Sequence, residues 1–345
     1  MSAQPAPARF QESNLWSTPI RDLGLTIEGT RLEPIILQFQ EELRRADLTR
    51  VRPRFYLSTE WGVPFQTVAI AIPFYLAHPD LTALHAERVG HVEGFDRADI
   101  LRYLRHEMGH VMNYAYCLYE EEEWVKQFGS ITQPYIEDYR PEPFSRRYVR
   151  HLPGWYAQKH PDEDWAETFA VWVTPGLDWR AEYGAWPVAA AKLAYCERTL
   201  AELRGRDPRN TNAELDEDVG DIEYSLDQYY GAASDPLGEA TRGLDGALRA
   251  IFEDLGEEEG MSLDEQMVPA DALIRRLEPE LLANVFRWTG HFPERTRVLV
   301  RYLAERAAQL QQGYAANRET AATVAFTTLV TGLAMNYVQR GSYLP

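Results

Sequence analysis

The feature that most constrains the fold of this chain is the pentapeptide HEMGH at residues 106–110, which lies inside an amphipathic stretch. Apolar residues recur around it at alternating spacings of three and four, which predicts a helix over about 99–123 with one buried stripe. On such a helix His106 and His110 lie one turn apart, on the face opposite the stripe. We therefore expect one side of the helix to be anchored in a core and the other to be free for a site. The stripe consists of Leu101, Leu104, Met108, Val111, Ala115 and Leu118.

The two histidines and the glutamate between them are typical of a metal site. Two imidazoles placed four residues apart on a helix can bind one Zn²⁺ at roughly 2.0–2.1 Å per bond. Glu107 would lie beside the open coordination position, where it can accept a proton from an activated water. Gly109 costs about 1 kcal/mol relative to alanine inside a helix, so we expect another backbone to approach it closely. The alternative interpretation is a pair of histidines on a polar helix face.

A catalytic zinc needs a third protein ligand, and the chain offers few candidates downstream. His151 and His160 lie in a proline-rich loop, and Glu163 and Glu167 lie on a predicted helix over about 162–173. These glutamates are four residues apart and so share a face of that helix. Glu163 could bind the metal, while Glu167 could accept the second N–H of a ligating histidine. By themselves the two carboxylates are typical of a solvated helix face, and which of them is the ligand stays open at this point.

Four segments together carry a resemblance to a known family. They are DLGLTIEG at 22–29, AIAIPFYLAHP at 69–79, LRHEMGH at 104–110 and the segment 144–173, which contains EDWAETF. They resemble a bacterial family of zinc-binding metallopeptidases, a branch of the zincins of the glutamate-ligand (gluzincin) kind. EDWAETF is similar to the equivalent helix of the lethal factor protease. The resemblance covers roughly residues 20–204 and does not extend over 205–345.

The resemblance implies an activity and a role for each site residue. It implies zinc-dependent hydrolysis of peptide bonds in a peptide or protein substrate, with one Zn²⁺ per chain. Two alternative hypotheses stand beside it: a zincin-fold binding or regulatory module without turnover, and a hydrolase of a non-peptide amide. The implied zinc ligands are His106, His110 and Glu163; Glu107 is the implied general base, and Glu167 supports a ligand. A tyrosine stands seven residues before the ligand glutamate in the related pattern, which corresponds to Tyr156 as the group that stabilises the oxyanion, with Tyr148 as the second choice.

The remainder of the chain predicts an α+β organisation in three parts. A zincin-like metallopeptidase domain over 1–205 would pair the HExxH helix with a small mixed sheet, whose strands are expected at 54–58 and 66–76. We expect residues 77–98 to form a loop and 206–238 to form an acidic connector. A mainly α-helical C-terminal region over 239–345 is a possible binding site for a partner protein. The strand in AIAIPFYL could be an edge that aligns an extended peptide or an ordinary core strand.

Charge and cysteine content exclude several classes of function. The 345 residues carry 35 Lys and Arg against 53 Asp and Glu, a formal net charge of −18. Such an acidic chain is poorly suited to nucleic acid or to an anionic membrane surface. Two cysteines make no disulfide scaffold, and the start of the chain has no secretory signal pattern, so we expect a cytoplasmic protein. The uncharged stretch 320–338 contains five threonines, which favours a buried helix over a membrane span.

Overall fold

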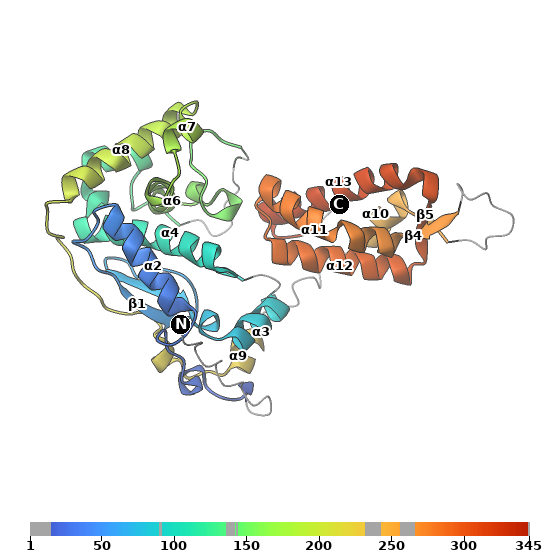
Figure 1. The fold of residues 1–345 in the computed structure, drawn as a ribbon, viewed down its shortest axis with the longest axis horizontal. Coiled ribbons are helices and arrows are strands. Elements are labelled where there is room, and N and C mark those ends of the chain that lie inside the picture. The colour runs from blue at the N-terminus through green and yellow to red at the C-terminus, as the bar shows by residue number, and fades with distance from the viewer. Residues whose placement is uncertain are drawn as a thin grey trace, which may run out of the picture. The chain divides into compact units, whose positions relative to one another are not determined.

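A computed structural model shows two compact units. The first comprises Met1–His85 and Val92–Ala233, and the second comprises Ala86–His91 and Ser234–Pro345 (Figure 1). Each unit combines helices with a small sheet, which confirms the predicted α+β class. The structure describes residues 15–89, 92–135, 142, 144–231, 243–255 and 266–343.

Helices make up most of the first unit, and the longest is α4, Arg97–Tyr116. It begins where the side chain of Asp96 accepts a hydrogen bond from the Asp99 amide, a standard N-terminal cap. It ends where Cys117 takes a left-handed conformation, with φ of 54°. The prediction of one helix to residue 123 is therefore wrong at its C-terminal end. The other helices are η1 Ile20–Leu23, α2 Leu32–Arg45, η2 Phe74–Ala77, α3 Pro79–Val89 (in this unit as far as His85), η3 Leu118–Glu120, α5 Glu122–Phe128, η4 Pro153–Gln158, α6 Pro161–Val173, α7 Trp179–Tyr183, α8 Pro187–Leu203, η5 Val219–Asp221 and α9 Leu226–Gly231.

The sheet of the first unit is small. Strands β1, Arg54–Ser58, and β2, Ala69–Pro73, are parallel, with Tyr56 opposite Ala71. On its other side the Ala71 amide donates a hydrogen bond of 2.8 Å to the carbonyl of Gly62, forming an antiparallel bridge. All five residues of β2 are buried. The burial of β2 agrees with the core-strand alternative. Because β2 pairs with one strand and has only a single bridge, at Ala71, on its other side, the alignment of a peptide along this edge stays a prediction.

The segment predicted as a loop over 77–98 contains α3. Its first turn is fixed by Thr82, whose hydroxyl donates to the carbonyls of Tyr75 and His78. The ring of His85 stacks on that of Tyr75, with centroids 3.6 Å apart. The helical spacing of this segment was missed because His85 occupies a buried position that is usually apolar.

The acidic segment belongs to the first unit wherever the structure describes it, which corrects the prediction of a connector over 206–238. The amides of Arg209 and Asn210 both donate to the carbonyl of Ala115, at 2.8 and 2.9 Å. The Val68 amide donates to the carbonyl of Asn212 at 2.6 Å. These backbone hydrogen bonds fix residues 206–231 on the surface of the unit while their carboxylates stay in water. Residues 232–238 lie outside the described part of the chain.

The second unit is a helical bundle with a small antiparallel sheet. Its helices share one apolar core, which includes Leu248, Leu273, Leu299 and Phe326. The helical prediction for this region is confirmed, and the sheet is an addition that sequence periodicity did not indicate. The strands occur in the order β3-β5-β4. The elements are α10 Leu244–Ile251, β3 Glu253–Asp254, β4 Met267–Pro269, α11 Ala270–Thr289, α12 Pro293–Gln309, β5 Gln312–Ala315, η7 Ala316–Arg318 and α13 Glu319–Arg340.

Helix α13 contains the uncharged stretch. Among the described residues, one helical span, Ala316–Arg340, is long and apolar enough to cross a membrane by length and composition. Ala322, Phe326, Val330 and Leu333 are buried in the core of the second unit. Only 28% of the most apolar window is buried. The helix is therefore buried along one face, and the expectation of a buried helix is met for that face only.

Candidate metal centre

Helices α4 and α6 pack closely, and a glycine permits the contact. A Cβ atom added to Gly109 would lie 2.6 Å from the Cα of Ala166. The indole N–H of Trp165 donates a hydrogen bond of 2.8 Å to the carbonyl of Gly109. The predicted approach of another backbone to Gly109 is thus confirmed, and that backbone belongs to α6.

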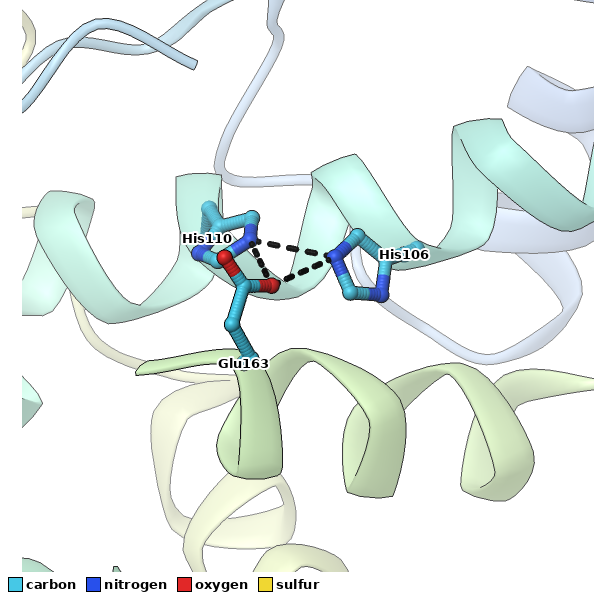
Figure 2. A group of neighbouring side chains, drawn as sticks. All are labelled: His106, His110 and Glu163. Carbon is cyan, nitrogen blue, oxygen red and sulfur yellow. Dashed lines mark hydrogen bonds and ion pairs between the residues drawn. The ribbon is translucent and has the colours of Figure 1, made fainter. Parts of the chain in front are cut away.

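The close packing brings together three side chains of the HExxH helix and the glutamate helix (Figure 2). Glu163 Oε2 lies 3.0 Å from His106 Nε2 and 3.3 Å from His110 Nε2. The two Nε2 atoms are 3.2 Å apart. All three side chains are buried. The face of α4 that was expected to be free for a site is therefore covered by α6, because the third member of the cluster comes from that helix.

The spacing of these atoms fits a small metal ion. In a tetrahedral zinc site with bonds of about 2.0–2.1 Å, neighbouring ligand atoms are about 3.3 Å apart. The three separations of 3.0, 3.2 and 3.3 Å are close to that value. Two imidazoles and one carboxylate suit zinc and also admit other first-row divalent ions. The three residues could therefore hold one such ion.

A carboxylate lies beside the other nitrogen of each histidine. Glu167 Oε1 is 2.9 Å from His106 Nδ1, and Asp162 Oδ2 is 3.0 Å from His110 Nδ1. The first contact is an aligned hydrogen bond, whereas the second lies off the ring's donor direction. Carboxylates in these places favour a proton on each Nδ1 and direct the lone pair of each Nε2 at the cluster. Three acceptor atoms then converge, and a cation or shared protons are needed to offset their repulsion.

Backbone groups fix the position of Glu167. Its carboxylate accepts hydrogen bonds from the amide of His151 at 2.8 Å and from the amide of Leu152 at 2.9 and 3.0 Å. The side chain is completely buried, so these donors replace the water that it has lost. The sequence suggested His151 as a possible ligand, but its ring lies 2.9 Å from the carbonyl of Arg102 instead. The ring of the other loop histidine, His160, caps the start of α6.

Asp162 was not predicted as a site residue. Its carboxylate contacts His110 and also accepts hydrogen bonds from the Asn113 amide group, at 2.7 Å, and from the Tyr114 hydroxyl. Asp162 immediately precedes Glu163 in the first turn of α6. Adjacent helix positions point in different directions, so sequence spacing gave no reason to place both carboxylates against one histidine pair.

The charges in the cluster shift one another's titration. Burial opposes the charged form of His106, but the hydrogen bonds that it donates to Glu163 and Glu167 outweigh burial and raise its pKa to about 9. The pKa of His110 is also raised, because the neighbouring carboxylates outweigh its burial. Burial opposes ionisation of Glu163 as well, yet the two histidines hold its pKa well below the ordinary value. Without a metal, the cluster thus binds protons tightly in the place of a cation.

Glu107 lies between the two histidines in sequence and is buried. In the described part of the chain its carboxylate accepts no hydrogen bond, which distinguishes it from the carboxylates of Glu163 and Glu167. Burial raises its pKa to about 7, although the neighbouring histidines lower it. A carboxylate with a pKa near neutrality is suited to accepting and returning a proton.

Two tyrosines lie beside the cluster. The ring of Tyr156 packs against that of His106, with centroids 5.5 Å apart. The Tyr135 hydroxyl donates a hydrogen bond of 2.9 Å to Glu163 Oε1 and lies 3.4 Å from the hydroxyl of Tyr156. Tyr135 was missed because it lies in a proline-rich stretch without periodicity. Tyr148, the second choice for the oxyanion, instead has its ring 4.4 Å from the ammonium group of Lys192.

No protein-family model, no curated protein and no solved structure matches this chain. The functional interpretation therefore depends on the residues and their geometry.

Proposed function

We propose that the first unit is a zincin-like domain and that the chain hydrolyses peptide bonds with one zinc ion held by His106, His110 and Glu163. The main support is the convergence of three buried ligand atoms at separations of 3.0–3.3 Å from helices α4 and α6. A helix carrying HExxH, a later helix carrying a glutamate and a small sheet are the parts that such a domain requires.

The chain's own residues then have distinct roles. When bound, zinc supplies Lewis acidity that activates water and the scissile carbonyl. Glu107 accepts the proton of the attacking water and returns it to the leaving amine. The Tyr156 hydroxyl donates a hydrogen bond to the oxyanion that develops on the carbonyl oxygen. Glu167 orients His106 and keeps its Nδ1 protonated. The substrate is a peptide or protein segment.

Replacing Glu107 by glutamine tests this proposal. The change preserves size and removes the base, so we expect peptide turnover to fall by about 10²–10⁴-fold or more while the zinc content stays at one ion per chain. Turnover is measured on a peptide library and zinc by elemental analysis. Glu122→Gln, at an exposed position on α5, is the matched control and should keep wild-type turnover.

Three results would separate the proposal from its alternatives. Full activity in Glu107→Gln would contradict the role of that carboxylate. Zinc binding without turnover of any library peptide by the wild type would favour a binding module. Hydrolysis confined to non-peptide amides would favour the third function.

A further inference from the structure

The guanidinium of Arg150 lies beside two neighbouring aromatic rings in the first unit. Its central carbon is 5.2 Å from the centroid of Phe144 and 5.1 Å from that of Trp155. The two rings make an edge-to-face contact of their own, with centroids 5.8 Å apart. Aromatic faces attract a cation and hold its plane in a defined orientation. The two rings therefore attract the cation without using any of its N–H groups.

Three buried donors of this cluster have no partner among the described residues. They are Nε and Nη2 of Arg150 and the indole Nε1 of Trp155. An unpaired buried donor is costly, and an unpaired buried charge more so. An arginine cannot avoid the cost by losing its proton at neutral pH. Nε and Nη2 form the side edge of the guanidinium, which matches the two oxygens of a carboxylate.

The backbone around the cluster is strained at both aromatic residues. Phe144 has φ of 61° and Trp155 has φ of 56°, and Gly154 before it has φ of 79°. Bulky side chains rarely adopt this left-handed region, which costs on the order of 1–3 kcal/mol per residue. Strain of this kind persists where the surroundings require a particular side-chain placement. Here both strained residues supply the rings that face the same guanidinium.

We propose that Arg150 and Trp155 form a binding site for a carboxylate group. The side edge of Arg150 would bind its two oxygens, and the Trp155 indole N–H would donate a third hydrogen bond. One guanidinium neutralises the single charge of a carboxylate, whereas a phosphate dianion would leave excess negative charge beside half-buried donors. The chain carries 53 acidic residues, yet none that the structure describes forms an ion pair with Arg150. A carboxylate fits this set of donors.

Chain connectivity places this site beside the candidate metal centre. Arg150 precedes His151, whose amide binds Glu167. Trp155 precedes Tyr156, whose ring packs on His106. If the proposed peptidase function holds, the site would recognise an acidic group of the substrate; binding itself is independent of zinc and of turnover.

The test measures binding to the full-length zinc-free protein by nuclear magnetic resonance. The probe is N-acetylglycine, and its neutral analogue N-acetylglycinamide is the control ligand. We expect the indole N–H signal of Trp155 and the Nε–H signal of Arg150 to shift in a saturable way with a Kd on the order of 1 mM, and to be unaffected by the neutral analogue. Binding that is absent, or equal for both ligands, would overturn the proposal. Tighter binding of inorganic phosphate would overturn the assignment to a carboxylate.

Variants that remove each donor test whether Arg150 and Trp155 bind the carboxylate. Arg150→Gln should raise the Kd about tenfold or more, since it removes charge-assisted hydrogen bonds. Arg150→Lys keeps the charge and loses the planar edge, so it should also weaken binding. Trp155→Phe keeps a ring and removes one donor, and a smaller increase in Kd is expected from the Arg150 signal. Arg146→Gln, at an exposed position four residues earlier, should bind as the wild type does. Unchanged binding in folded Arg150→Gln protein would contradict the proposal.

Discussion

The α4–α6 contact and the core of the second unit are both helix packings, but they bury opposite kinds of side chain. The core of the second unit is apolar, with Leu299, Leu303 and Phe326 fully buried. Helices α4 and α6 together carry seven buried histidine and carboxylate side chains. Apolar burial stabilises by about 25 cal/mol per Å², whereas buried charges stabilise little even when paired. These seven residues are His106, Glu107, His110, Asp162, Glu163, Asp164 and Glu167.

This difference indicates that the side chains of the two regions serve different purposes. Among the described residues, each buried carboxylate of α4 and α6 except Glu107 takes part in hydrogen bonds or ion pairs, as Asp164 does with the Lys192 ammonium. The network orients three acceptor atoms toward one point. An apolar contact of the same size would give more stability. We infer that the α4–α6 contact is arranged for binding, and the second unit's core for stability.

The largest expected effect is on metal content. We expect about one zinc per purified wild-type chain and its loss in Glu163→Ala, which removes a ligand. Glu167→Ala should weaken zinc binding by about 10–100-fold without abolishing it. Leu299→Ala in the second unit should cost roughly 2–5 kcal/mol of stability and keep the zinc. Elemental analysis and urea unfolding measure the two quantities. A wild type without zinc after reconstitution would remove the proposed mechanism, and zinc retained in Glu163→Ala would exclude that residue as a ligand.

Removing the metal should make stability depend on pH in a defined direction. His106 has a folded pKa of about 9 against an ordinary value of 6.5. A group with a raised pKa stabilises the folded state fully below pH 6.5, and this stability is lost as the pH rises through about 9. The loss corresponds to about 3 kcal/mol. We expect urea unfolding in EDTA to show it between pH 6 and about 9.5. With zinc the trend should reverse, because protons and metal compete for the same atoms. Equal slopes with and without zinc would contradict the metal site.

A smaller effect is expected at Asp162. Asp162→Asn keeps the size of the side chain and removes the charge beside His110 Nδ1. Losing a carboxylate behind a ligating histidine typically weakens metal binding by about 10–100-fold. Competition with a chelator of known affinity measures the change. Asp227→Asn, at an exposed position on α9, is the matched control. Equal zinc affinity in both variants would show that the contact does not tune the histidine.

The spacing of residues along the chain predicted the two helices that carry the candidate metal site. The period of three and four around residues 101–118 located α4, and the carboxylates at Glu163 and Glu167 located the second helix of the site. Gly109 even indicated a close contact, because glycine inside a helix needs a reason. These signals are carried by residues that are near one another in the chain.

The features that were missed depend on contacts between distant segments. Tyr135 reaches Glu163 from 28 residues away, and no periodicity marks it. The end of α4 at Tyr116 was missed because Cys117 adopts the left-handed conformation usually taken by glycine. The segment 206–231 joins the first unit through backbone hydrogen bonds. Such bonds cannot be inferred from the composition of the side chains. The cluster at Arg150 combines Phe144 and Trp155, whose unusual φ angles have no sequence signature.

Two glycine substitutions give the smallest effects and the most direct comparison of the regions. Gly109→Ala would place a methyl group 2.6 Å from the backbone of Ala166, so α6 must move. Overpacking costs about 1–3 kcal/mol, which exceeds the gain of about 1 kcal/mol from helix propensity. An added Cβ at Gly332 on α13 would meet nothing within 4 Å beyond its own stretch of helix, so Gly332→Ala should stabilise by up to about 1 kcal/mol. We therefore expect urea unfolding to show a lower free energy of unfolding for Gly109→Ala and a higher one for Gly332→Ala. Stabilisation by Gly109→Ala would mean that α4 and α6 can separate without cost, and zinc content measured on the same sample would show whether the ligand cluster survives that separation.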